Sequence, residues 1–85
     1  MKQQNIYIVT VEYSEEYSYD YRNQYPELYY DNLEMADIKL VEQMSRICHP
    51  QMWEVDEQGC FSYTSVEGCS YMAYVRSVPL NKSKD

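Results

Sequence analysis

Hydrophobic and polar positions divide the chain into one early strand, one helix and three later strands. Residues 5–13 form a nearly continuous apolar and β-branched run, which is typical of a central strand covered on both faces. Three short strands are predicted at 52–56, 60–65 and 70–78. The two turns between them each contain one of the two glycines in the chain, and glycine supplies the positive φ that hairpin returns commonly require. We therefore expect the three later strands to form an antiparallel meander.

One helix is predicted between the first strand and the meander. Its start is indicated either by Pro26, which suits the first helical position, or by Asp31 with Glu34 three residues later, a capping-box pattern. It ends before Pro50. At about 100° per residue, six apolar side chains fall on one face, which we expect to lie on a sheet. These residues are Tyr29, Leu33, Ala36, Leu40, Met44 and Ile47.

The segment 14–25 fits two interpretations. Tyr17, Tyr19 and Tyr21 alternate with polar residues, a period of two that is typical of a strand with one aromatic face. The acidic pair at 15–16, however, lacks the glycine or asparagine that tight hairpin turns favour, so the segment equally fits an extended loop.

Together these elements predict a single small α+β domain over residues 1–80, with a frayed polar tail at 81–85. One helix packs on an antiparallel sheet of four or five short strands, in the order β-(β)-α-β-β-β. A chain of 85 residues buries only about 60% of its unfolded surface, which leaves little material to enclose a deep catalytic cavity. The length therefore disfavours an elaborate enzyme.

Sequence motifs for nucleotide binding, nucleophilic catalysis and metal binding are absent. The two glycines are isolated, so the chain has no Gly-rich phosphate loop, and it has no nucleophile elbow. Cys48, His49, Cys60 and Cys69 are suitable zinc ligands by type, but the only close pair is adjacent, whereas structural sites space their ligands two to four residues apart. We expect three free thiols, no metal, no cofactor and no catalytic residue.

Membrane-spanning and export segments are also not found in the sequence. No uncharged apolar run approaches the ~20 residues of a membrane span, and the apolar run near the amino end is too short for a signal peptide. Three cysteines are an odd number, which argues against a disulfide framework. We expect a cytoplasmic protein that does not bind a membrane.

Charge is distributed unevenly. The chain has 14 acidic and 7 basic residues, a net charge of −7, and residues 12–42 carry nine acids against Arg22 and Lys39. Because phosphate contacts come chiefly from Lys and Arg, direct nucleic-acid binding is disfavoured. Seven of the 11 tyrosines lie between Tyr13 and Tyr30, interleaved with these acids, and Tyr is enriched at protein interfaces. The composition indicates a partner protein with a basic surface.

The predicted helix adds a second part to this candidate interface. Its acids form a stripe away from the core face, and the apolar residue Ile38 lies within the stripe, flanked by Tyr30 and Val41. Three apolar residues grouped on an outer face suggest either a docking surface or a site for a second layer of the same chain, which the segment 14–25 could supply. The acids of the stripe also fit a solubilising face, which is typical of amphipathic helices. The stripe consists of Glu27, Asp31, Glu34 and Glu42.

The leading hypothesis is a small acidic module that occupies a basic surface of another protein, in particular one that binds nucleic acid. It would inhibit by competition, as acidic DNA mimics of phages and mobile elements do, although this analogy is one of composition. The alternative is a homodimer or structural protein without an inhibitory role, in which Tyr30, Ile38 and Val41 contact a second copy. A small thiol or metal enzyme is the third interpretation, and no motif with proper spacing supports it.

The expected contact residues come from the tyrosine-rich segment and from the outer side of the predicted helix. They combine carboxylates, which attract a basic surface, with apolar and aromatic side chains, which bury area against it. They are Glu15, Glu16, Tyr17, Tyr19, Asp20, Tyr21, Glu27, Tyr30, Asp31, Glu34, Ile38 and Glu42.

Overall fold

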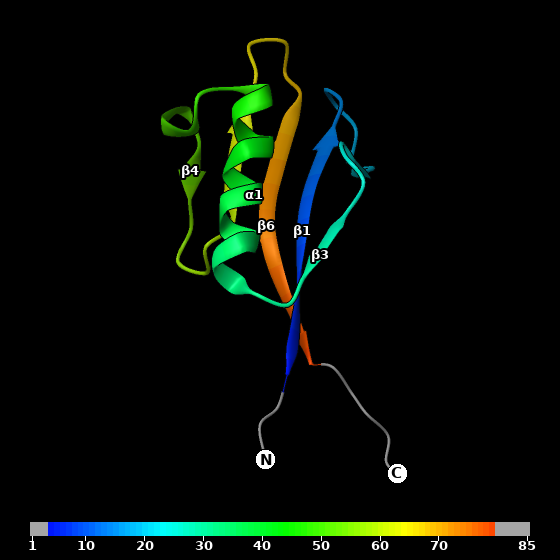
Figure 1. Ribbon diagram of the computed structural model, residues 1–85. Coiled ribbons are helices and arrows are strands. Elements are labelled where there is room, and N and C mark those ends of the chain that lie inside the picture. Colours follow the sequence, from blue (N-terminus) through cyan, green and yellow to red (C-terminus); the bar gives the residue numbers. More distant parts are fainter. Residues whose placement is uncertain (1–3, 80–85) are drawn as a thin grey trace.

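In the computed structural model, which describes residues 4–79, one α-helix packs on one face of an antiparallel sheet (Figure 1). The predicted α+β class is confirmed, with the element order β-β-β-α-β-β-β. The predicted polar tail at 81–85 lies outside the described residues. The elements are β1 (Asn5–Ser14), β2 (Arg22–Asn23), β3 (Leu28–Tyr30), α1 (Leu33–Ile47), the 3-10 helix η1 (Pro50–Met52), β4 (Glu54–Val55), β5 (Phe61–Thr64) and β6 (Ser70–Pro79).

Two long strands form the centre of the sheet. β1 and β6 pair antiparallel over ten residues each, from Asn5 opposite Pro79 to Ser14 opposite Ser70. The strand order is β2-β1-β6-β5-β4, and β3 pairs with β1 further along the same edge as β2. The central position predicted for the first strand and the antiparallel meander of β4, β5 and β6 are both confirmed.

The core lies between α1 and the face of the sheet that it covers. Alternate residues of a strand point to the same face, so Val9 and Val11 both point toward α1. Residues of α1 that recur every four positions form one face of the helix and pack onto these valines, as predicted. The buried apolar residues of this core are Val9, Val11, Ala36, Leu40, Met44, Trp53 and Ala73.

The helix begins later than predicted. Its N-cap is Asn32, whose side-chain oxygen accepts a hydrogen bond of 3.0 Å from the backbone N–H three residues later. Neither Pro26 nor Asp31 therefore starts the helix. Residues 28–30 instead extend along β1 as β3. Tyr29, predicted on the core face of the helix, consequently lies on the sheet with 62% of its surface exposed.

One other residue of the predicted core face is also exposed. Leu33 is the first residue of α1, and about half of its surface is accessible to solvent, whereas Ala36 is the first residue of the helix that is buried. Further along the same face, Leu40 and Met44 are buried and Ile47 is half-buried. The predicted core face is thus correct from the second turn onward.

Most of the segment 14–25 is a loop. Only Arg22 and Asn23 pair with β1. Tyr17 has φ of 64°, in the left-handed region, which interrupts any extended conformation at this point. The alternating tyrosines therefore do not form the face of a strand, and the loop interpretation holds for residues 15–21.

Among residues 4–79, no helix covers the face of the sheet opposite α1, yet this face buries three side chains of β1. They are Ile8, Thr10 and Ser14, which point to the same face because they are alternate residues of one strand. The Glu27 carboxylate accepts hydrogen bonds from the Thr10 hydroxyl at 3.2 Å, from the Tyr29 hydroxyl at 3.3 Å and from the Arg76 guanidinium at 3.3 Å. This network gives Glu27 a structural role on the sheet.

Candidate protein-binding site

One end of the sheet is formed by two loops that lie far apart in the sequence. β1 ends at Ser14 and β6 begins at Ser70, and these two residues are paired. The loop that follows β1 and the turn that precedes β6 therefore meet at the same end of the molecule (Figure 1). We call the surface formed by residues 15–21 and 65–69 the acidic tip.

The two loops touch where Glu16 lies across Gly68. A methyl group at Gly68 would lie 2.8 Å from Cγ and 3.0 Å from Cδ of Glu16, closer than carbon atoms normally approach. Gly68 also has φ of 93°, a conformation that residues with a side chain rarely adopt. Glycine at this position thus allows both the hairpin turn and the contact between the loops.

Hydrogen bonds from serines hold the first loop in place. The buried Ser14 hydroxyl donates to the carbonyl oxygen of Ser18 at 2.7 Å, and the Ser18 N–H donates to the carbonyl oxygen of Glu15 at 3.0 Å. The Ser18 hydroxyl accepts from the N–H of Asp20 at 3.1 Å. Between these bonds, Tyr17 is held in the left-handed conformation, which costs roughly 1–2 kcal/mol for a residue with a side chain. Such conformations persist where surrounding contacts fix them, and they cluster at functional sites.

A row of aromatic rings supports the base of the tip on the side that faces α1. The rings of Tyr13 and Tyr71 lie 6.2 Å apart, and those of Tyr71 and Tyr63 lie 6.1 Å apart, on three neighbouring strands. Trp53 contacts the end of this row, 5.6 Å from Tyr63. The loops of the tip therefore begin from a packed layer.

The tip exposes carboxylates and large apolar side chains together. Tyr17 and Tyr19 are 94% and 96% exposed, and Val66 is fully exposed. Within residues 4–79 none of the carboxylates of the tip forms an ion pair. These carboxylates belong to Glu15, Glu16, Asp20 and Glu67.

Six of the twelve predicted contact residues come together at this tip. All six belong to the loop after β1, and they are Glu15, Glu16, Tyr17, Tyr19, Asp20 and Tyr21.

The other six predicted residues do not form one surface with the tip. Glu27 is engaged with Arg76 on the open face of the sheet, and Tyr30 is half-buried against the core. The remaining four lie before or along α1, whose N-terminal end points away from the tip (Figure 1). They are Asp31, Glu34, Ile38 and Glu42.

The predicted acidic stripe on the helix is wrong in part. Glu27 and Asp31 precede α1, so helical spacing does not relate them to Ile38. Glu34 and Glu42 are exposed on α1, and Glu42 pairs with Lys39 at 3.2 Å. The stripe on α1 is therefore shorter than predicted, and one of its charges is partly compensated.

Two exposed residues of the tip were not among the contact residues predicted from the sequence. Val66 and Glu67 lie in the turn before β6, and their position beside Glu16 follows from the register of β1 with β6. The turn with its glycine is predicted from the sequence, whereas the pairing of β6 with β1 is not. That pairing would have indicated both residues.

Metal-ligating and nucleophilic side chains are dispersed in the part of the chain that the structure describes. Cys48, Cys60 and Cys69 are free and half-buried, and no three His, Cys, Asp or Glu residues among 4–79 are placed to hold a metal ion. Burial raises the pKa of the Cys60 thiol, and the nearby carboxylates of Asp56 and Glu12 raise it further. A thiol of raised pKa is a poor nucleophile at neutral pH.

Comparison with known proteins finds no family model, no curated protein and no solved structure that matches the chain. Residues 4–79 form no helix that is long and apolar enough to cross a bilayer. The fold and the site together define a small α+β domain with an acidic, aromatic tip.

Proposed function

We propose that the protein is a binding module whose acidic tip docks onto a basic surface of a partner protein. The observation that supports this proposal is the convergence of four carboxylates and three strongly exposed apolar side chains on one end of the sheet. Carboxylates without an internal partner attract a basic surface and accelerate encounter. Exposed aromatic side chains then contribute buried area once contact is made.

The free energies of burial and of association show that binding requires both the aromatic and the charged side chains of the tip. Burial of an aromatic side chain removes roughly 150–250 Å² from water, so Tyr17 and Tyr19 together contribute about 7–12 kcal/mol at ~25 cal/mol per Å². Association costs about 4–15 kcal/mol in lost freedom. Two tyrosines therefore only balance that cost. The charges at the tip supply orientation and speed of association, and further contacts supply the remaining affinity.

A basic surface that binds nucleic acid is the kind of partner that this composition fits best. Such surfaces gather Lys and Arg side chains to neutralise phosphates. A tip with four carboxylates, on a chain of net charge −7, competes for those side chains. The protein would then act as a competitive inhibitor of nucleic-acid binding by its partner.

The proposal is tested with two variants of equal charge. Immobilised protein captures partners from a lysate of the cells that make it, and association of the captured partner is then measured at low and high salt. In the tip variant Glu15, Glu16, Asp20 and Glu67 become amides. In the control, four exposed acids beside or on α1 become amides, namely Asp31, Glu34, Asp37 and Glu42.

We expect the tip variant to associate at least tenfold more slowly at low salt and to show a weaker salt dependence, because rim charges act mainly on association rate. The control variant should remain within about twofold of the original protein. Equal losses in the two variants would mean that net charge alone matters. A loss confined to the control would place the contact surface at α1 and overturn the assignment to the tip.

Self-association through α1 is the second candidate function. Met35, Ile38 and Val41 are each about half exposed, and their spacing places them on the outer side of α1. Tyr30, which was predicted to join them, is instead packed against the core. Sedimentation of the original protein and of Ile38→Asp decides this candidate, because only a dimer through this face would dissociate on substitution.

A further inference from the structure

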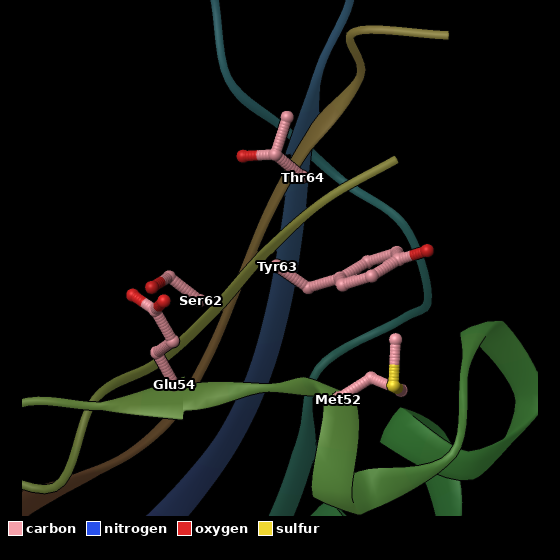
Figure 2. Close-up of a pocket in the computed structure, with 5 residues that line it drawn as sticks. All are labelled: Met52, Glu54, Ser62, Tyr63 and Thr64. Carbon is pink, nitrogen blue, oxygen red and sulfur yellow. The ribbon is translucent and has the colours of Figure 1, made fainter. Parts of the chain in front are cut away.

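A cavity of about 300 Å³ lies at the edge of the sheet where β4 separates from β5 (Figure 2). β4 pairs with β5 at two positions only, with Glu54 opposite Ser62 and Val55 opposite Phe61. Before β4 the chain forms η1 instead of continuing along β5. As a result, within the described residues, Tyr63 and Thr64 pair with β6 on one side and have no strand partner on the other side.

The lining of the cavity has a polar side and an apolar side. Glu54, Ser62 and Thr64 contribute a carboxylate and two hydroxyl groups. The side chains of Glu54 and Ser62 lie side by side in Figure 2, and Thr64 lies farther along β5. The Tyr63 ring and the Met52 side chain form the other side. Contact with Trp53, at 5.6 Å between ring centroids, fixes the Tyr63 ring in this orientation.

The charge at the cavity is negative and has no internal counterion in the described part of the chain. Glu54 is exposed and takes part in neither of the two ion pairs found among residues 4–79. Asp56 and Glu57 follow in the next turn and add to the negative potential. A cationic ligand is therefore favoured over a neutral or anionic one.

We propose that this cavity receives one lysine or arginine side chain of the partner protein. These side chains have an apolar stem and a charged end, which match the two sides of the cavity. The stem lies against Met52 and Tyr63, while the charged end donates to the Glu54 carboxylate and to the hydroxyl groups of Ser62 and Thr64. A volume of about 300 Å³ is at the lower limit for ligand pockets, which suits a single side chain.

The location of the cavity connects this inference to the tip. Thr64 directly precedes the turn at 65–69, so the cavity adjoins the acidic tip along β5. A basic surface docked on the tip extends over this edge of the sheet and places one cation in the cavity. The inference rests on the proposed function for the source of the cation, whereas the cavity itself is tested with small molecules.

The test is an NMR titration of the whole protein with N-acetyl-arginine amide and N-acetyl-lysine amide. N-acetyl-norleucine amide serves as the matched neutral ligand, because it keeps the apolar stem and lacks the charge. We expect the two cations to shift amide signals of residues 52–54 and 62–64, with a dissociation constant on the order of 1 mM. Glu54→Gln should weaken binding at least fivefold, and the control Glu57→Gln less than twofold.

Three results would overturn the inference. These are equal binding of the norleucine ligand, shifts spread evenly over all acidic residues, and unchanged affinity in Glu54→Gln. Loss of partner binding in the tip variant together with a negative titration would retain the proposed function and remove the cavity from it. Site-specific cation binding together with an unaffected tip variant would retain the cavity and refute the proposed function.

Discussion

Substitution of Gly68 by alanine tests how the acidic tip is held together, and Gly59 provides the matched control. Both glycines lie in hairpin turns with similar backbone angles, φ of 93° and 89°. A methyl group at Gly59 would have no atom within 4 Å, whereas at Gly68 it would lie 2.8 Å from Cγ of Glu16. The two substitutions therefore share the backbone strain and differ in the contact between the loops.

The expected costs follow from these distances. A side chain in the left-handed region costs about 1–2 kcal/mol, which is the whole loss of unfolding free energy expected for Gly59→Ala. Gly68→Ala must also move Glu16 from its rotamer, at a further ~0.5–1.5 kcal/mol. For a domain of this size, each kcal/mol lowers the melting temperature by about 4–8 °C. Gly68→Ala should thus melt several degrees below Gly59→Ala.

The assay is equilibrium unfolding in urea, followed by the fluorescence of the single, buried Trp53. Each glycine variant is also combined with Glu16→Ala, which removes Cγ and Cδ from the contact. Cβ of residue 16, 3.1 Å from the added methyl group, remains in the combination. The combination should therefore remove most of the extra cost of Gly68→Ala over Gly59→Ala and should leave the cost of Gly59→Ala unchanged. Equal costs for the two glycines, without coupling to Glu16, would show that the loops do not support each other and would refute the description of the tip as one surface.

Two further predictions concern the core and the response to alkaline pH. Leu40→Asp should prevent folding because it buries an unpaired charge at a residue that is 3% exposed. Ile38→Asp, at a residue that is 51% exposed, should keep the circular dichroism spectrum of the original protein. Equal unfolding of both variants would mean that α1 is covered on two sides. Burial raises the pKa values of Cys60, Tyr71 and Tyr74, so the folded state holds these protons more tightly than the unfolded state does. Their contribution to stability is complete at pH 7 and is lost as the pH rises above about 9, so the urea midpoint should fall between pH 7 and pH 10.5. A constant midpoint would contradict the burial of these groups.

The elements that could be predicted are those in which the spacing of the apolar residues matches the face that is buried. The continuous apolar run of β1 and the four-residue spacing in α1 reflect one dominant buried face each. β3 could not be found in this way, because residues 28–30 are stabilised by pairing with a strand about twenty residues earlier. Two adjacent residues, Asp31 and Asn32, are both good caps, and only the position of β3 decides between them.

The site was predictable to the extent that it lies within one segment. Glu15 to Tyr21 carry the acidic and aromatic pattern locally, so composition indicated them. Glu67 depends on which strands are neighbours, and that information is tertiary. The assignment of Glu27 failed for the same reason, since its partner Arg76 lies at a distant position of the sequence. Helical spacing is informative only after the ends of the helix are known.

The pairing of β1 with β6 also determines how the protein can be tethered. Asn5 and Pro79 are direct cross-strand partners, so their Cα atoms lie about 4.5–5.5 Å apart, at the end of the sheet opposite the tip (Figure 1). A carrier protein or solid support attached at either position therefore leaves the tip facing outward. The same proximity allows a short linker to join the two positions, with new chain ends opened in the turn at Gly59, which would give a circular permutant with an intact tip.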